Sequence, residues 1–291
     1  MGSFDGMTGD GASDLLGIVA GGGRLPRIIA DHAAASGRSV RIAALSGHTD
    51  PATVEGYPHL WGALGQAGKL GEWLFLQGVR DLCLIGPVKR PAWSELVPDF
   101  RTAQFLATVI PKALGDDGLL KAIKAKLESV GFRVIGAHEL LADLLVPEGL
   151  LTRTGVDPAY QADIDLGIRQ ARAIGQLDIG QAVVVQSGLV LAVEASEGTD
   201  AMVARTAELR REGAGGVLVK LCKPQQDRRL DLPTIGAETV RRAHQAGLVG
   251  IVVEAGRTLI IDRDRAVALA DQLGLFVQAI TIPTLGQDRS A

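Results

Sequence analysis

The sequence predicts an α/β protein with two domains, and three observations lead to this fold class. Short apolar runs alternate along the chain with longer segments of helical composition, which is the rhythm of a doubly wound sheet. Several of these runs are continuously apolar, as in parallel strands that are covered on both faces. The length of 291 residues lies in the range where a chain usually divides into more than one hydrophobic core.

The composition is that of an ordinary globular protein. The chain has 30 Lys+Arg and 33 Asp+Glu, a formal net charge of −3, and 47% hydrophobic residues, which excludes disorder as its main state. This charge provides no basic field for nucleic acid, and 4% aromatic residues are too few for stacking on single strands. Two cysteines without a C-x-x-C or H-E-x-x-H motif favour a reducing, cytoplasmic setting without zinc.

The first half of the chain predicts a Rossmann-like parallel sheet over residues 15–146, after a flexible leader at 1–14. The strand Leu15–Ala20 runs into a glycine loop and then a helix, with Pro26 well placed for the first helical turn. Gly37 and Gly78 end the first two predicted helices. The predicted elements of this half are strands at 15–20, 40–45, 81–85 and 132–135 and helices at 26–36, 69–77, 101–114 and 116–130.

The second half predicts a separate α/β domain over residues 158–283, joined by a linker at 147–157 and followed by a tail at 284–291. Proline and glycine punctuate the linker, and the Gly188 turn between two apolar runs predicts a hairpin. The order of its strands does not follow from the sequence. The predicted elements are helices at 158–174, 200–211, 237–245 and 263–273 and strands at 182–185, 189–193, 216–221, 249–253, 258–261 and 276–280.

Two loops that follow strands of the first half predict an anion site. Glycine lets backbone N–H groups approach a ligand, and the helix N-terminus after the glycine loop favours anions. The loop is no complete dinucleotide fingerprint, because Pro26 replaces the third glycine and no acidic residue follows about twenty positions later. A tight turn and a solvated basic turn are the alternatives. The candidate phosphate-binding residues are Gly21, Gly22, Gly23, Arg24, Lys89 and Arg90.

Acidic residues after strands predict a magnesium site. Glu194, Glu197 and Asp200 lie within seven residues of each other, and oxygen ligands without His or Cys suit Mg²⁺ held partly through substrate phosphates. Asp116 and Asp117 open a predicted helix, where capping is the stronger explanation. Capping by Asp200 also explains part of the first group.

The segment from Lys220 to Asp231 is the densest polar stretch, and it follows a predicted strand. It combines cations that suit phosphate with carboxylates that suit a metal or a general base, although a solvated loop would look similar. From these residues alone, the chain is a two-domain enzyme or binder of a phosphate-containing metabolite, with its ligand between the halves. The further candidate substrate-binding residues are Lys220, Lys223, Gln226 and Thr199.

Six motifs in this order resemble the two-domain UDP-2,3-diacylglucosamine pyrophosphatase family of lipid A biosynthesis, which is unrelated to the metallophosphoesterase form. Together they cover the chain from about residue 15 to 283. The family commonly has an apolar residue where Arg228 stands and an aromatic one where Leu230 stands, which puts local packing in doubt more than chemistry. The six motifs are I-V-A-G-G-G-R-L-P at 18–26, G-P-V-K-R-P at 86–91, G-D-D at 115–117, D-I-G-Q-A-V-V-V at 178–185, E-A-S-E-G-T-D at 194–200 and Q-D-R-R-L-D-L-P-T-I-G at 226–236.

The resemblance implies that water cleaves the pyrophosphate of UDP-2,3-diacylglucosamine at the sugar-side phosphorus, with Mg²⁺ required, to give UMP and 2,3-diacylglucosamine 1-phosphate. The family's essential aspartate matches Asp227, and cations nearby are expected to keep this carboxylate ionised. Glu197 and Asp200 are further catalytic candidates. The candidate metal ligands are Asp227, Asp200, Glu194, Asp116 and Asp117.

The lipid substrate implies an apolar groove, which we expect in the second domain near the runs 247–253 and 275–282, with plain core strands as the equal alternative for both runs. The enzyme is expected in the cytoplasm, and contact with the inner-membrane surface and a homodimer stay open. Two other functions also stay open. A nicotinamide-dependent oxidoreductase would use the glycine loop but lacks the ribose-binding acid, and a non-catalytic nucleotide-sugar sensor would not need so many carboxylates beside cations.

Overall fold

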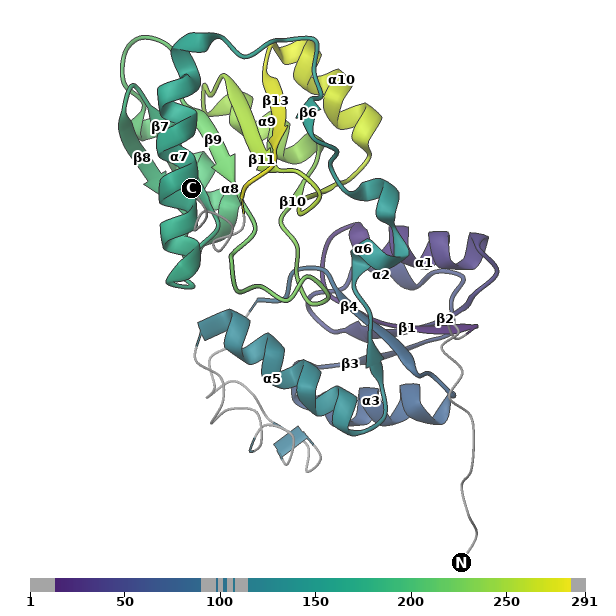
Figure 1. Cartoon of the computed structure of the whole chain (residues 1–291). Coiled ribbons are helices and arrows are strands. Elements are labelled where there is room, and N and C mark those ends of the chain that lie inside the picture. Colours follow the sequence, from purple (N-terminus) through teal and green to yellow (C-terminus); the bar gives the residue numbers. More distant parts are fainter. Residues whose placement is uncertain (1–13, 90–97, 99–101, 104–106, 108–114, 284–291) are drawn as a thin grey trace, which may run out of the picture. The chain divides into compact units, whose positions relative to one another are not determined.

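The computed structural model describes residues 14–89, 98, 102–103, 107 and 115–283, with the side chains of 115–117 excepted (Figure 1). It divides into two compact units, one of residues 1–113 and 119–140 and the other of residues 114–118 and 141–291. Each unit has its own sheet with helices, so the predicted α/β class and the two-domain organisation are confirmed. Within the described residues, no helix has the length and hydropathy of a membrane span.

The sheet of the N-terminal unit has five parallel strands in the order β3-β2-β1-β4-β5. The order reverses between β1 and β4, which lie side by side with Ala20 opposite Ile85. Such a reversal is the place where α/β sheets bind ligands. The strands are β1 (Leu15–Ala20), β2 (Ser39–Leu45), β3 (His59–Gly62), β4 (Asp81–Ile85) and β5 (Arg133–Val134).

Helices of the N-terminal unit pack their apolar residues onto this sheet. In α3, Leu70 and Leu74 are spaced one turn apart, so both point into the cluster that Leu82 joins from β4. Gly37 and Gly78 follow α1 and α3 with φ of 87° and 85°, which confirms glycine as the residue that ends both helices. The helices are α1 (Leu25–Ala35), α2 (Pro51–Val54), α3 (Ala67–Leu76), α5 (Gly115–Ser129) and α6 (Ala137–Leu140).

The sheet of the C-terminal unit is mixed, with the strand order β6-β13-β11-β9-β7-β8. Strands β13, β11 and β9 are parallel, whereas β7 runs antiparallel to β9 and forms the predicted hairpin with β8. The strands are β6 (Gly149–Leu150), β7 (Ala182–Gln186), β8 (Leu189–Val193), β9 (Val217–Lys220), β11 (Gly250–Glu254) and β13 (Phe276–Ile280), and a separate pair is β10 (Thr234–Ile235) with β12 (Leu259–Ile260).

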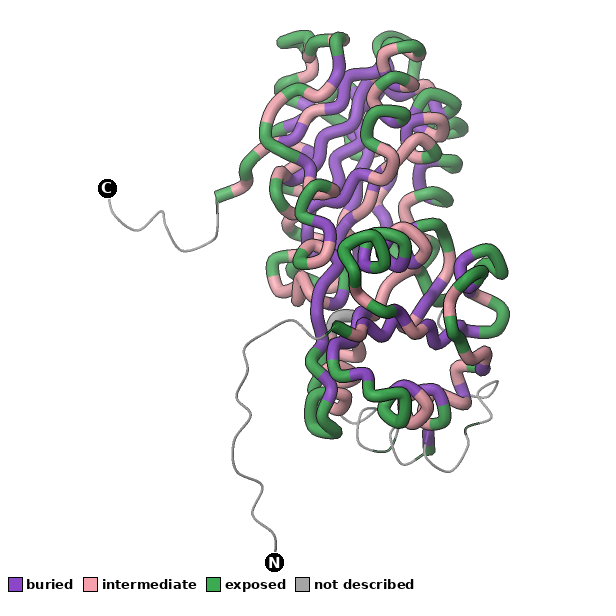
Figure 2. The backbone as a smooth tube through the Cα atoms, turned by 90° about the vertical axis from the view of Figure 1, so that its right-hand side faces the viewer, coloured by how far each residue is buried: buried purple, intermediate pink, exposed green. Residues whose placement is uncertain are grey.

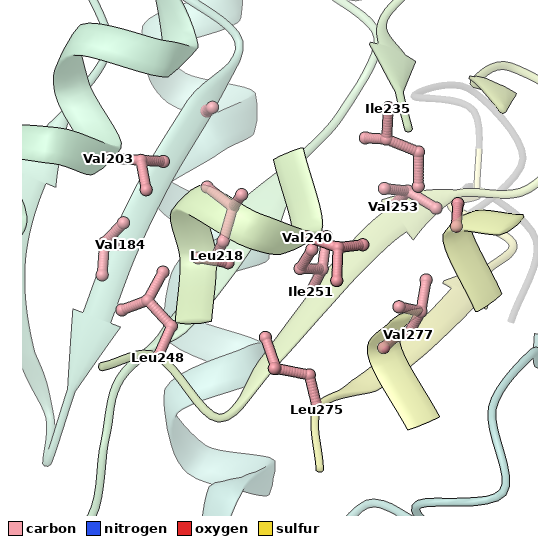
Figure 3. Close-up of a cluster of buried hydrophobic side chains, with 14 of the residues drawn as sticks. Val184, Val203, Leu218, Ile235, Val240, Leu248, Ile251, Val253, Leu275 and Val277 are labelled. Atoms are coloured by element: carbon pink, nitrogen blue, oxygen red, sulfur yellow. The ribbon is translucent and has the colours of Figure 1, made fainter. Parts of the chain in front are cut away.

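Alternate residues of these strands fill two hydrophobic layers, one on each face. Val184 and Leu218 belong to a cluster with α8, α9 and α10 (Figure 3), whereas Val183 and Val219 pack with α7 on the other face. The buried stretches in Figure 2 follow the strands accordingly. Burial on both faces explains the continuous apolar runs of the sequence. The helices are α7 (Gln161–Gln176), α8 (Gly198–Leu209), α9 (Ala237–Gln245) and α10 (Arg263–Leu273).

The structure differs from the sequence prediction in its short elements. Residues 147–157, predicted as a linker, contain β6, whose Gly149 pairs with Ala279 of β13, so this stretch extends the C-terminal sheet. Strand β3 has only four residues and was also not predicted. Most of the helix predicted at 101–114 lies outside the described residues.

Candidate functional site

The candidate site lies at the edge of the C-terminal sheet that is formed by the ends of its strands, where β8, β9 and β11 end and β7 begins. Lys220 ends β9, between Ala182 of β7 and Val253 of β11. Glu254 ends β11 and Glu194 follows β8, so three strands place ionisable residues at the same edge. The carboxyl ends of parallel strands are where open α/β sheets bind ligands.

The loop at 221–233 leaves this edge and connects β9 with β10. Leu230 and Leu232 are 7% and 6% exposed, so the loop has an apolar anchor in the fold. Between them and the strand, the chain turns at Asp227, whose carbonyl oxygen accepts a hydrogen bond from Leu230 N at 2.9 Å. The aliphatic side chain at Leu230 therefore packs well where the family commonly has an aromatic one.

Asp227 lies on this loop in a bidentate ion pair with Arg229. Its Oδ1 accepts hydrogen bonds from the Arg229 backbone N and Nε, both at 3.1 Å, and its Oδ2 accepts one from an Arg229 terminal nitrogen at 3.0 Å. The Asp227 side chain is 18% exposed and that of Arg229 is 42% exposed. The carboxylate is therefore charged, oriented and reachable from solvent, as a catalytic or metal-binding oxygen must be.

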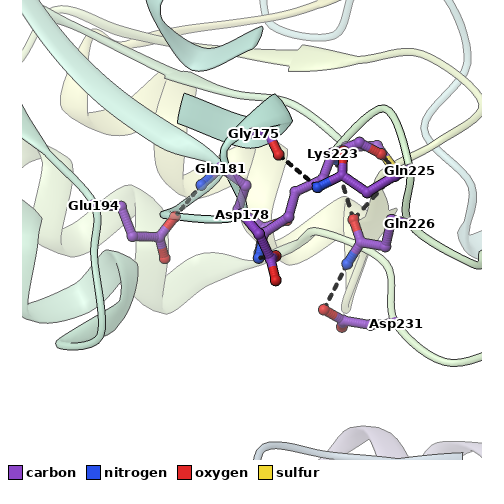
Figure 4. A network of polar contacts seen from close by, with 9 residues as sticks. Gly175, Asp178, Gln181, Glu194, Lys223, Gln225, Gln226 and Asp231 are labelled. Carbon is purple, nitrogen blue, oxygen red and sulfur yellow. Dashed lines mark hydrogen bonds and ion pairs between the residues drawn. The ribbon is translucent and has the colours of Figure 1, made fainter. Parts of the chain in front are cut away.

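A network of polar side chains holds the rest of the loop (Figure 4). Gln226 Oε1 accepts a hydrogen bond from Lys223 N at 3.1 Å, and its Nε2 donates to Asp231 Oδ2 at 2.7 Å. Lys223 Nζ forms an ion pair with Asp178 at 2.7 Å. Lys223 and Gln226 were predicted to bind substrate, and in this structure both are engaged in shaping the loop. Asp178 was not singled out from the sequence.

Glu194 is buried, with 6% exposure, and its carboxylate has two partners. Oε1 accepts a hydrogen bond from Thr199 Oγ1 at 2.7 Å, and Oε2 accepts one from Gln181 N at 3.1 Å. A side chain at Gly180 would lie 2.1 Å from the Glu194 carbonyl oxygen, so only glycine fits there. The predicted metal ligand Glu194 and the predicted substrate-binding Thr199 thus bind each other and tie β8 to α8.

Lys220, predicted as a surface cation for phosphate, is buried, with 7% exposure. Its Nζ donates to the carbonyl oxygen of Thr234, the first residue of β10, at 3.1 Å. Burial lowers the pKa of this ammonium group, while the negative charges of Glu194, Asp231 and Asp200 oppose that shift.

Cys222 and Glu254 form a second contact at the base of the loop, which the sequence did not reveal. Glu254 is 5% exposed, and its Oε2 accepts a hydrogen bond from Cys222 N at 3.1 Å. Burial raises the pKa of the Glu254 carboxyl, against the charge of Arg257. Burial also raises the pKa of the Cys222 thiol to about 12. The available signal for Glu254 was its position directly after the apolar run 249–253.

Glu197 and Asp200, the other two catalytic candidates, lie at the N-terminus of α8. Hydrogen bonds from its own backbone and from Arg205 lower the pKa of the Glu197 carboxyl. Asp200 is 60% exposed and lies 3.5 Å from Arg242 Nε. Acidic side chains are stabilising near the N-terminal end of a helix dipole, but Glu197, the N-cap residue, makes no side-chain capping hydrogen bond. In the part of the chain that the structure describes, no three His, Cys, Asp or Glu residues form a ready-made metal site.

In the N-terminal unit, the glycine loop crosses the loop after β4. Gly21 N donates to Ile85 O at 2.8 Å and Gly22 N donates to Pro87 O at 2.9 Å. A side chain at Gly21 would lie 2.3 Å from Gly86 O. The amides of Gly21 and Gly22, predicted to bind phosphate, are therefore engaged within the fold, and the glycines are required by the close approach of the two loops.

The remaining candidates of this unit are solvent-facing or undescribed. Gly23, with φ of 76°, Arg24 and Lys89 are exposed. They follow β1 and β4, on both sides of the point where the strand order reverses. Arg90, and the side chains of Asp116 and Asp117 in the C-terminal unit, lie outside what the structure describes, so their roles stay predictions.

The apolar groove expected from residues 247–253 and 275–282 is not formed by those runs. Ile251, Val252 and Val253 are fully buried, and Phe276 and Val277 are 2% exposed. These residues belong to the strands β11 and β13 and fill both hydrophobic layers of the sheet. They are core, and the prediction of an acyl-binding groove there was wrong.

Comparisons with known proteins settle the family. One family model, the LpxI N-terminal domain, matches residues 15–144, and another, the LpxI C-terminal domain, matches residues 147–278. The chain belongs to the LpxI family. A curated member, UDP-2,3-diacylglucosamine pyrophosphatase LpxI of Caulobacter vibrioides, is 46% identical over 272 residues, which are 91% of this chain and 97% of that protein. The family expected from the six sequence motifs is thereby confirmed.

Among solved structures, the crystal structure of gox2253 matches this LpxI chain with a TM-score of 0.29 and 12% identity, over 94% of this chain and 90% of that one. A score this low supports no argument about the fold or the function of the LpxI chain.

Proposed function

We propose that this LpxI chain hydrolyses the pyrophosphate bond of UDP-2,3-diacylglucosamine, giving UMP and 2,3-diacylglucosamine 1-phosphate. The observation that carries the proposal is the 46% identity, over nearly the whole length of both chains, to a protein named for this activity. The loop with the oriented, solvent-reachable Asp227 supports it, because a carboxylate in such a position can hold a metal or orient water for the hydrolysis of a phosphoric anhydride.

Asp227 is the residue on which the proposed chemistry depends. The double hydrogen bond from Arg229 keeps its carboxylate negative and fixes its plane. From that position it would either bind the metal or orient the attacking water, which we propose reaches the sugar-side phosphorus. Arg229 has a solvent-exposed side chain, and a cation beside Asp227 suits the charge of the diphosphate. In the N-terminal unit, Lys89 and Arg24 are exposed cations and stay candidate substrate-binding residues. Glu197 and Asp200 stay secondary candidates.

We propose Mg²⁺ as the cofactor. Magnesium is commonly held by one or two carboxylates together with substrate phosphates, so a single oriented carboxylate such as that of Asp227 suits an ion that binds with the substrate. Asp227 would hold it, with Asp116, Asp117 and Asp200 as further candidates. When bound, it would neutralise charge that develops on the phosphate oxygens.

We place the enzyme in the cytoplasm, at the inner-membrane surface. The free thiols of Cys83 and Cys222 are typical of a reducing compartment, and a substrate with acyl chains resides in a membrane. Its partners would be the lipid substrate and the lipid product, and a homodimer remains compatible with the proposal.

Mass spectrometry of the intact products tests the proposed reaction. The purified protein is incubated with UDP-2,3-diacylglucosamine, with Mg²⁺ or with excess EDTA after removal of metals. We expect UMP and 2,3-diacylglucosamine 1-phosphate with Mg²⁺ and almost none with EDTA. Bound but unchanged substrate would instead identify a sensor, reduction of an added nicotinamide cofactor would identify an oxidoreductase, and full turnover in EDTA would exclude the metal.

A further inference from the structure

Lys220 joins the two ends of the loop that contains Asp227. It is the last residue of β9, and Thr234, whose carbonyl oxygen accepts the Lys220 Nζ hydrogen bond at 3.1 Å, is the first residue of β10. The loop at 221–233 spans the sequence between them. This hydrogen bond therefore joins the two ends of the loop, next to the central strands of the C-terminal sheet.

The surroundings of Lys220 hold its side chain in one position. Its backbone is flanked by β7 and β11, and the residue is 7% exposed. Burial lowers the pKa of its ammonium group, and the nearby Glu194, Asp231 and Asp200 side chains oppose that shift. A buried ionisable group with a hydrogen-bond partner and nearby opposite charges is held in place, because leaving that position would lose the hydrogen bond and the electrostatic attraction.

The other contacts of the loop act at different points along it. Glu254 binds Cys222 N directly after β9, and Arg228 donates to Gly256 O at 2.8 Å in the middle of the loop. Arg229, which pairs with Asp227, belongs to the same loop, so this ion pair is a contact within the loop. Within the loop, Gln226 links Lys223 to Asp231, and the hydrogen bond from Lys220 joins the two strands on either side of the loop.

We propose that Lys220 is a positioning residue, which closes the base of loop 221–233 and thereby fixes Asp227 for the reaction, and that it makes no contact with the substrate. This inference rests on the function proposed above. A small displacement of a catalytic group can lower the rate by roughly 10²-fold. The loss should therefore appear in kcat, while KM should change little.

The test compares Lys220→Met with Lys69→Met. Methionine keeps the length of the buried side chain without its charge, and Lys69 is an exposed lysine of the N-terminal unit that serves as the matched control. Hydrogen exchange measured by mass spectrometry reports the loop independently of activity. We expect amide exchange in 222–232 to be roughly tenfold faster or more in Lys220→Met, with β11 unchanged, because a charge-assisted hydrogen bond is lost. Lys69→Met should match the wild type.

Kinetics and chemical rescue complete the test. Lys220→Cys in a Cys83→Ala, Cys222→Ala background, alkylated with 2-bromoethylamine in the unfolded state and then refolded, regains an ammonium group at nearly the same distance, so it should recover slow loop exchange and kcat together. The reaction is carried out on unfolded protein because buried thiols do not react in the native state, and the equally treated double-alanine protein is the control. Unchanged loop exchange, a raised KM with normal kcat, or unfolding of the whole C-terminal unit in Lys220→Met would each overturn the proposal. If the wild type does not hydrolyse the substrate, the proposed function fails, while the exchange result still decides whether Lys220 closes the loop.

Discussion

At the residue scale, the pair between Asp227 and Arg229 determines what a metal ion must displace. Arg229 occupies both oxygens of the carboxylate, so a cation that binds Asp227 competes with a bidentate guanidinium. The guanidinium released from Asp227 would then be able to bind a phosphate, for which its planar donors are well suited. Arg228, its neighbour, is directed to Gly256 O instead and offers a control of equal charge.

Arg229→Gln should strengthen metal binding in the absence of substrate and weaken turnover. We expect the affinity for Mn²⁺, which substitutes for Mg²⁺ and is measured by electron paramagnetic resonance, to rise several-fold. Each 1.4 kcal/mol of binding free energy that the arginine no longer opposes corresponds to about a tenfold change in affinity. Arg228→Gln should leave that affinity unchanged, and Asp227→Asn should abolish the effect. Weaker Mn²⁺ binding in Arg229→Gln would show that the arginine supports the metal site and does not compete with it.

The two thiols should be inert in the native protein. Burial raises the pKa of both Cys83 and Cys222 to about 12, with the charge of Glu139 adding to the shift at Cys83 and that of Glu254 adding at Cys222. At pH 8 the thiolate fraction of each is then about 10⁻⁴, and the thiolate is the reactive form. Titration with Ellman's reagent should find almost no reactive thiol in the native state and both after unfolding in guanidinium chloride. Fast reaction of either cysteine with native protein would contradict the burial described here.

At the element scale, the crossing of two glycine loops fixes the end of the N-terminal sheet. Gly21 and Gly86 approach so closely that a side chain on Gly21 would overlap backbone atoms, and Gly86 also has φ of 94°. Backbone cannot move aside as a flexible side chain can, so the substitution must displace the loop. Packing thus explains why glycine stands at the first two positions of the G-G-G motif, and Gly23 is the exposed member of the three.

Gly21→Ala should destabilise the N-terminal unit by about 1–3 kcal/mol. The matched control is Gly71→Ala in α3, where a side chain meets nothing within 4 Å and a helix interior favours alanine by roughly 0.5–1 kcal/mol. Trp61 and Trp73 lie in this unit and residues 141–291 contain no tryptophan, so tryptophan fluorescence during urea unfolding reports this unit. Equal midpoints for Gly21→Ala and the wild type would show that the two loops are not in close contact in solution.

At the scale of the whole molecule, the sequence was sufficient for the architecture and less so for the site. Long apolar runs and glycine stops predicted most strands and helices, because burial on both faces leaves a strong pattern. Strands β3 and β6 were missed, since four and two residues are too few for a periodicity. The order of the C-terminal strands could not be predicted, because pairing between distant segments leaves no local signal.

Prediction from sequence has the same limit for the single residues of the site. Lys220 and Lys223 lie in one polar stretch, and from sequence both look like surface cations, yet one is buried against Thr234 and the other is paired with Asp178. Which polar side chains hold a loop and which face solvent depends on tertiary contacts. Asp227 was found through the motif that the family shares, and the structure adds its partner Arg229.

The central claim is that this LpxI chain cleaves its substrate through Asp227, and one paired measurement tests it most directly. Wild type and Asp227→Asn are incubated with UDP-2,3-diacylglucosamine and Mg²⁺ in H₂¹⁸O, and products are quantified by mass spectrometry. The account predicts ¹⁸O in the 2,3-diacylglucosamine 1-phosphate of the wild type, and turnover lower by roughly 10²–10⁴-fold in Asp227→Asn, with substrate still bound. Undiminished turnover by Asp227→Asn, or intact substrate with the wild type, would contradict it.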